Sequence, residues 1–151
     1  MWKILGKIAH LWPTWFYRFI SNFHSKIIKF NFTKTGKRIL GDNILLLETI
    51  GNKTKKLRKT PLAYVKVEEF YLVAASYSGS DKTPDWFFNL NTTSVYITID
   101  GVRFEATYEL VDDISKSEMW KHLDDLYPTF KNYRKRTKRN IPLIKFSKVM
   151  V

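Results

Sequence analysis

The 151-residue chain contains no cysteine and only three histidines. Disulfides, thiol nucleophiles and cysteine metal ligands are therefore excluded. His10, His24 and His122 lie far apart in the sequence, and none has a second ligand at the spacing of a zinc site. We therefore expect no metal site.

Signatures of self-sufficient catalysis are also missing. The chain has no G-x-S-x-G nucleophile motif, no P-loop and no G-x-G-x-x-G dinucleotide motif. The pairs Asp112-Asp113 and Asp124-Asp125 flank a predicted helix, where we expect solvated or capping carboxylates rather than a catalytic dyad. Such a chain can still be an enzyme if a cofactor performs the chemistry.

Acidic residues are absent from both ends of the chain. Residues 1–41 and 126–151 each contain eight Lys or Arg and no Asp or Glu, and the net charge of the whole chain is +12. Both ends should attract an anionic partner such as a phosphate, an acidic lipid or nucleic acid. The run RKRTKR at 134–139 keeps a nucleic-acid-binding interpretation open, although such runs are usually solvated faces.

The N-terminal segment at 1–41 is basic, aromatic and apolar, but it lacks the uncharged run of about 18 residues that a transmembrane helix requires. Arg18 and Lys26 interrupt any signal-peptide core, and Pro13 is expected to divide two helices. The segment either packs its aromatic face on the domain or lies on an anionic membrane surface. The second alternative predicts a cytoplasmic protein that is peripheral on the inner face of the membrane. Its interfacial side chains would be Trp2, Lys3, Lys7, Trp12, Trp15, Phe16, Arg18, Phe19, Phe23 and Lys26.

The remainder, 42–151, is predicted to be one α+β domain, a small barrel of antiparallel strands with a few helices outside. Asp100-Gly101 is a favoured two-residue hairpin turn, and the strand after it alternates apolar residues from Val102 to Leu110. The predicted strands span residues 44–49, 61–67, 70–76, 95–99, 102–110 and 141–146.

Two helices are predicted in the last third of the chain. Ser115 and Glu118 form a capping box for a helix at 115–126. Its apolar stripe is Met119, Leu123 and Leu126. Tyr127, Phe130 and Tyr133 follow at helical spacing and should share one side of a further helix.

The stretch Thr49–Leu90 combines features suited to a flat ligand with a phosphate tail. A basic turn at 51–60 leads into a strand, and the next strand ends in the small residues Ala75 and Ser76. Lysine and arginine side chains can hold an anion, and a ligand can approach the backbone closely where side chains are small.

Three motifs, in this order and spacing, resemble those of the deazaflavin-dependent nitroreductases, also called F-420-dependent quinone reductases. TIGNKTKKLRKTPL at 49–62 is similar to the family's T-x-G-R-K-[ST]-G-x-x-R-x-x-P-L. VAASYSGSDKTPDWFFNL at 73–90 is similar to VAS-x-G-G followed by P-x-W-x-x-N-L. YPTFKNYRKRTKRNIP at 127–142 is similar to Y-P-x-[YF]-x-x-Y-x-x-x-T-x-R-x-I-P.

The resemblance implies a split β-barrel related to the FMN-binding split barrels. It also implies an oxidoreductase in which reduced deazaflavin coenzyme F-420 passes hydride to a quinone or another electron-poor conjugated acceptor. A lipid quinone would suit a protein on a membrane surface. The alternatives are FMN as the cofactor, or a non-catalytic barrel that binds FMN or haem or stores the deazaflavin.

Roles for single residues follow from the same resemblance. The coenzyme's phosphate would be bound by Lys53, Thr54 and Arg58. Tyr127 and Tyr133 match aromatic positions of the substrate pocket, where a hydroxyl could orient or protonate the acceptor. The positions that line the deazaflavin ring or close the loop around it fall on Pro61, Leu62, Ala75, Ser76, Ser78, Gly79, Trp86 and Asn89.

Two departures from the family pattern affect the expected phosphate site. Asn52 stands where the family usually has Arg, and Lys55 stands where it has Gly. The neighbouring lysines should offset the charge lost at Asn52. A lysine in place of glycine predicts a turn with a different backbone conformation.

Overall fold

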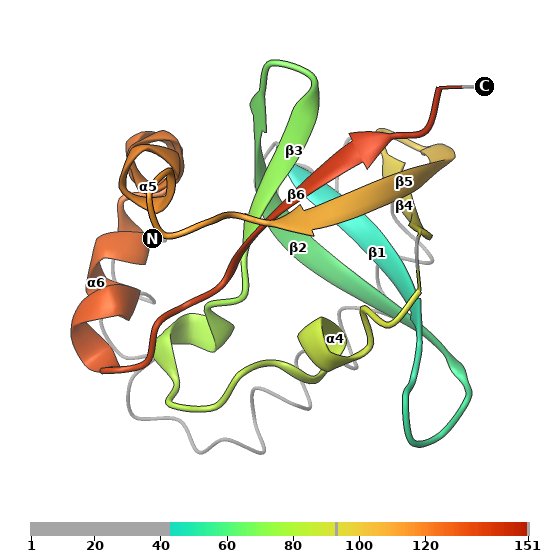
Figure 1. Ribbon diagram of the computed structural model, residues 1–151, viewed down its shortest axis with the longest axis horizontal. Coiled ribbons are helices and arrows are strands. Elements are labelled where there is room, and N and C mark those ends of the chain that lie inside the picture. Colours follow the sequence, from blue (N-terminus) through green and yellow to red (C-terminus); the bar gives the residue numbers. More distant parts are fainter. Residues whose placement is uncertain (1–42, 93, 151) are drawn as a thin grey trace, which may run out of the picture.

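The computed structural model describes residues 43–92 and 94–150. Within them, antiparallel strands close into a barrel in the order β1-β2-β3-β6-β5-β4, and helices lie outside it (Figure 1). The strands are β1 (Ile44–Ile50), β2 (Leu57–Val67), β3 (Phe70–Ala74), β4 (Ser94–Ile99), β5 (Val102–Leu110) and β6 (Leu143–Lys148). The helices are η2 (Tyr77–Gly79), α4 (Asp85–Phe88), α5 (Lys116–Leu126) and α6 (Thr129–Arg136). The predicted α+β barrel is confirmed. The predicted helices of 1–41, with His10 and His24, lie outside the described residues.

Several strand boundaries differ from the prediction, and the differences at β2, β3 and β6 exceed one residue. The expected basic turn at 51–60 is wrong in its second half, because β2 begins at Leu57 and pairs with Ile50 of β1. Pairing with the apolar strand β1 overrides the basic composition there, because it satisfies the backbone hydrogen bonds. Strand β3 ends at Ala74, and β6 starts at Leu143, after Pro142, which has no N–H to donate to a ladder.

The barrel interior is filled by alternate residues of all its strands. Along β4, Val95, Ile97 and Ile99 are buried as predicted. Along β5, the predicted inward set fails at both ends, where Val102 is 62% exposed and Leu110 is 59% exposed. These two residues stand at opposite ends of their strand, beyond the packed centre at Ala106. The predicted turn at Asp100-Gly101 is confirmed, with positive φ angles of 51° and 82°.

A second apolar cluster fills the space between the helices and the outer face of β2, β3 and β6. It joins Leu72 of β3 to Leu123 of α5 and Phe130 of α6. Figure 1 shows both helices on the same side of the barrel. The cluster comprises Leu72, Ala74, Val111, Met119, Leu123, Phe130, Ile141 and Leu143.

The start and end of α5 differ from the sequence prediction. The Ser115 side chain does not cap the helix; its amide and its hydroxyl both donate to the Asp112 carboxylate, at 2.8 and 3.0 Å. These two bonds hold the pKa of Asp112 below its ordinary value. The capping box is therefore wrong, and an Asp-initiated turn precedes the helix instead. Leu126 is exposed, because the buried stripe ends at Leu123.

Candidate functional site

The hairpin loop between β1 and β2 is a tight turn closed by its own backbone. The Gly51 amide donates to the Lys56 carbonyl at 2.9 Å, and the Lys55 amide donates to the Gly51 carbonyl at 2.8 Å. Lys55 has a φ of 53°, in the left-handed region that favours glycine. The lysine adopts a conformation that glycine would take with less strain. The expectation that this turn differs from the family's in backbone conformation stays a prediction.

Among the described residues, the lysines of this loop have no acidic partner. Lys53, Lys55 and Lys56 are exposed, and within the described part of the chain none of them forms an ion pair. Arg58, which lies on β2 rather than in the loop, donates from Nη2 to the Thr54 hydroxyl at 3.2 Å. A cluster of exposed cations of this kind can hold a phosphate.

Asparagines tie this loop to the segment that follows α4. The Asn52 amide donates to Asn89 Oδ1 at 2.9 Å, and Asn91 Nδ2 donates to Asn52 Oδ1 at 3.5 Å. Asn52, which stands where the family usually has arginine, therefore connects the hairpin loop to the segment that follows α4. Asn89, which the resemblance places among the residues that line the ring or close the loop around it, accepts this bond from the cationic loop.

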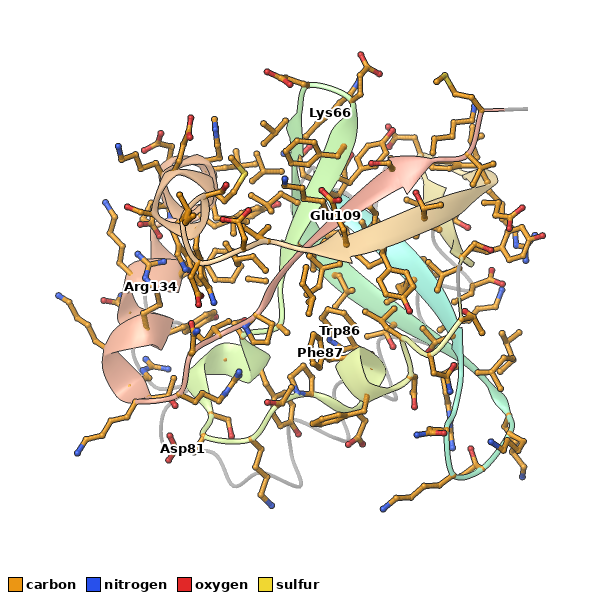
Figure 2. The ribbon with its side chains drawn as sticks, in the orientation of Figure 1. Lys66, Asp81, Trp86, Phe87, Glu109 and Arg134 are labelled. Atoms are coloured by element: carbon orange, nitrogen blue, oxygen red, sulfur yellow. The ribbon has the colours of Figure 1, made fainter. Side chains whose placement is uncertain are left out.

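Three of the predicted ring-lining residues belong to the apolar cluster inside the barrel or pack against it. Ala75 and Trp86 are buried in the barrel cluster, and Leu62 packs against it. Figure 2 shows Trp86 and Phe87 side by side above α4, directed toward the barrel. Pro61 pairs with Leu46 on β1 and faces away from Leu62, because neighbouring strand residues alternate sides. The structure therefore joins three of the predicted site residues in one apolar floor.

The turn that follows β3 has an unusual backbone. Tyr77, Ser78 and Gly79 have consecutive positive φ angles of 45°, 56° and 77°. A Cβ added to Gly79 would lie 2.7 Å from the carbonyl oxygen of Tyr133 in α6. Gly79 therefore allows close packing on α6, a role that the resemblance did not assign to it. Ser78 remains exposed, whereas Ser76 is buried.

Two residues that the sequence did not predict, Thr137 and Arg139, bind this turn through their side chains. Arg139 Nη2 donates to the carbonyls of Ala75 at 2.8 Å and Ser76 at 2.9 Å, and its Nε donates to the Ser80 carbonyl at 2.9 Å. The Thr137 hydroxyl donates to Asp81 Oδ1 at 2.6 Å, which adds a further hydrogen bond between the turn and the segment that contains Arg139. Thr137 and Arg139 match the Thr and Arg of the third family motif, and that match is the sequence signal for them, whereas the basic run at 134–139 predicts only solvated side chains. Burial lowers the pKa of Arg139, although Asp81 acts in the opposite direction.

The two predicted substrate-pocket tyrosines flank Phe130 on the second cluster. Their ring centroids lie 5.8 Å (Tyr127) and 5.7 Å (Tyr133) from that of Phe130, both in edge-on contact. The Tyr127 hydroxyl donates to the Asn43 carbonyl at 3.0 Å. The hydroxyl of Tyr133 makes no hydrogen bond to the residues that the structure describes. Phe130 and Tyr133 lie on α6 as predicted, but Tyr127 does not, because it follows the last residue of α5 and precedes α6.

The sequence is similar to a known family and to individual proteins of that family. Residues 21–146 match the model of a family described as F420H(2)-dependent quinone reductase. The chain belongs to this family. An F420H(2)-dependent quinone reductase of Mycobacterium tuberculosis is 32% identical over 126 residues, which cover 80% of this chain and 85% of that protein. Family membership confirms the predicted resemblance, enzyme class and deazaflavin coenzyme.

Solved structures share the fold. An F420-H2 dependent reductase has 28% identity and a TM-score of 0.62, covering 69% of this chain and 93% of its own. The haem storage protein HutZ of Vibrio cholerae has 12% identity and a TM-score of 0.55, covering 74% and 84%. The latter likeness concerns the fold alone. Together they confirm the predicted split-barrel class.

Proposed function

We propose that this protein uses reduced deazaflavin coenzyme F-420 to transfer hydride to a quinone or another electron-poor conjugated acceptor. The observation that carries the proposal is the cationic hairpin of Lys53 and Arg58, which forms no ion pair within the described residues, in a barrel of this family with an apolar interior. When bound, the coenzyme supplies the hydride from C5 of its ring. The protein aligns donor and acceptor and excludes water.

The donor set of the hairpin fits the coenzyme's acidic parts. A phosphodiester and a glutamate tail require cations that are not already neutralised by the protein. Lys53 offers an exposed point charge, and Arg58 offers a planar fork whose orientation is supported by Thr54. The extra lysines at 55 and 56 raise the local positive potential, which compensates for Asn52.

The remaining predicted residues would serve two purposes: some provide an apolar surface, and others orient or protonate the acceptor. Leu62 and Trp86 would form the apolar surface from which water is excluded. Of the two tyrosines, Tyr133 is the better candidate to orient or protonate the acceptor, because the Tyr127 hydroxyl already donates to Asn43. Tyr127 would instead position the neighbouring rings.

A parallel titration with coenzyme F-420 and with FMN, followed by fluorescence, tests the proposal. We expect micromolar or tighter binding of F-420 and weaker binding of FMN. Lys53→Ala and Arg58→Ala should each weaken F-420 binding by about 1.5–3 kcal/mol, the value of a charge-assisted contact. Lys66→Ala is the matched control, because it removes an exposed lysine at the opposite end of β2 (Figure 2).

The titration separates the alternatives. Preference for FMN would keep the barrel and change the cofactor, and a haem spectrum would favour a storage protein. Binding of none of these would overturn the enzyme proposal. With F-420 bound, turnover of a short-chain quinone and of a nitroaromatic compound would show which acceptor class the site prefers.

We also propose that the protein meets a lipid quinone at the cytoplasmic surface of an anionic membrane. The support is the excess of basic residues in the segment 1–41, which contains no acid. In the described ranges 43–92 and 94–150, no helix is long and apolar enough to cross a membrane. Full-length protein should sediment with vesicles containing phosphatidylserine. Replacing Lys3, Lys7, Arg18 and Lys26 by Gln should release it, whereas unchanged sedimentation would contradict surface binding.

A further inference from the structure

The turn after β3 is held in a conformation that the chain does not favour by itself. Tyr77 and Ser78 are left-handed although neither is glycine, and such residues persist only where their surroundings determine them. Three contacts hold the backbone of this turn in place. They are the Gly79 backbone against Tyr133, the Asp81–Thr137 bond, and Arg139.

The bonds from Arg139 determine which way two peptide groups face. Its Nη2 binds the carbonyl oxygens of both Ala75 and Ser76. In a trans peptide the carbonyl and the following N–H point in opposite directions, and the described residues contain no cis bond. The amides of Ser76 and Tyr77 must therefore point away from Arg139, on the other side of the turn.

These two amides are not used within the turn. The bonds inside it run from the Gly79 amide to the Ser76 carbonyl, at 3.0 Å, and from the Ser80 amide to the Tyr77 carbonyl, at 3.1 Å. Among the described residues, neither the Ser76 nor the Tyr77 amide donates to an acceptor. Successive N–H groups where a right-handed residue (Ser76, φ −78°) meets a left-handed one form a concavity that binds electron-rich oxygens.

We propose that Arg139 is a positioning residue that aims the Ser76 and Tyr77 amides at the carbonyl oxygens on the edge of the deazaflavin ring. The inference rests on the proposed function and on the ring-lining positions that the family resemblance implies, and it adds the role of Arg139 in orienting their backbone. The fork of arginine is needed, because Nη2 and Nε bind carbonyls on both flanks of the turn at once. A lysine ammonium on an unbranched stem cannot span both flanks.

The geometry is tested first without any ligand, by amide hydrogen exchange of Arg139→Gln and Arg139→Lys. In both variants the Gly79 and Ser80 amides should exchange at least 10-fold faster, while amides of β1 and β4 keep their wild-type rates. Arg103→Gln is the matched control, because it removes an arginine bound to Glu48 at the other end of the barrel. Unchanged exchange in the turn would overturn the proposal.

The second measurement separates positioning from general loss of fold. Affinity for F-420 should fall less than 10-fold in both Arg139 variants, because the phosphate contacts remain. The single-turnover rate of hydride transfer to a short-chain quinone should fall about 10–100-fold, as expected for a ring misplaced by about an ångström. Arg139→Lys should rescue neither the rate nor the shifted fluorescence of the bound coenzyme.

Two outcomes would count against the idea in different ways. The first outcome is that both Arg139 variants lose thermal stability, as expected also for Arg103→Gln, but keep the wild-type rate of hydride transfer. Arg139 would then only stabilise the fold, and the inference would be wrong. If the wild-type protein binds no F-420, the proposed function fails, and the ring site fails with it. Should Arg139→Gln not fold, Gly79→Ala displaces the same turn from its α6 side and must reproduce the loss of rate.

Discussion

The hairpin loop at 51–56 and the turn at 75–81 each follow a strand of the same barrel, yet they offer different parts of the chain to a ligand. The loop exposes long cationic side chains, and asparagines tie its backbone to the segment after α4. In the turn, Ala75 and Ser76 are buried, and their carbonyls accept hydrogen bonds from Arg139. We expect the first arrangement to attract and hold an anion, and the second to fix the backbone donors of the proposed ring site.

This difference implies different tolerance to substitution. In the loop, a changed side chain removes one charge but leaves the backbone bonds in place. In the turn, a change at one residue moves the peptides of its neighbours, because each of its contacts fixes the same short backbone segment. Breaking the turn should therefore have larger effects than breaking the loop.

The largest expected effect comes from Gly79→Ala. The added Cβ would lie 2.7 Å from the Tyr133 carbonyl oxygen and 2.9 Å from its Cα, so the backbone of α6 or of the turn must shift. Together with the positive φ, this should lower the free energy of unfolding by about 2–4 kcal/mol, measured by urea denaturation. Gly101→Ala is the control, because Gly101 also has a positive φ of 82° but none of the described residues beyond its chain neighbours has an atom within 4 Å of the added Cβ.

Gly101→Ala should cost only about 1 kcal/mol, the strain of a left-handed alanine. The difference between the two variants then measures the contact between the turn and α6. Equal losses would mean that Gly79 matters for its dihedral angles alone.

The sequence was sufficient to predict most of the fold and the cationic half of the site. Alternation of apolar residues identified β4 and β5, and Asp100-Gly101 identified their turn, because both signals are local. The lysines of the hairpin loop could be identified for the same reason, since their charge requires no partner.

The turn could not be predicted in the same way. Its conformation depends on Arg139, some 60 residues away in sequence, whose role is visible only once β3 and β6 pair. The same holds for β2, whose basic first residues become strand because β1 lies beside them. Non-local hydrogen bonds decided both of these cases.

An intermediate effect is expected at the barrel wall behind the cationic loop. Glu48 on β1 is buried, and it accepts bonds from Lys59 Nζ at 2.9 Å and from Arg103 Nε and Nη2, each at 3.2 Å. Burial would raise the pKa of Glu48, but the bonds from Arg103 and Lys59 outweigh it and hold the pKa below the ordinary 4.5.

The stabilisation by Glu48 should therefore be fully present above about pH 4.5 and be lost as pH falls through the lower folded-state pKa. Glu48→Gln should cost about 1–2 kcal/mol at pH 7 and remove part of the decline in stability between pH 5 and 3. Urea midpoints measured across this range check it, and parallel curves for the two proteins would contradict it. Amide exchange in the turn at 75–81 should not change, because Glu48 does not contact it.

The smallest effects sharpen the comparison most, because they place one substitution in each region. Lys55 has a φ of 53° and Ser78 has a φ of 56°, so glycine should relieve strain at both. Lys55→Gly and Ser78→Gly should each raise the free energy of unfolding by about 0.5–1 kcal/mol. Only Lys55→Gly removes a charge, so only it should weaken F-420 binding at low salt, and the difference should shrink at high salt. If Ser78→Gly instead slows hydride transfer with binding unchanged, a flexible turn is the cause, which would confirm that the loop acts through charge and the turn through rigidity.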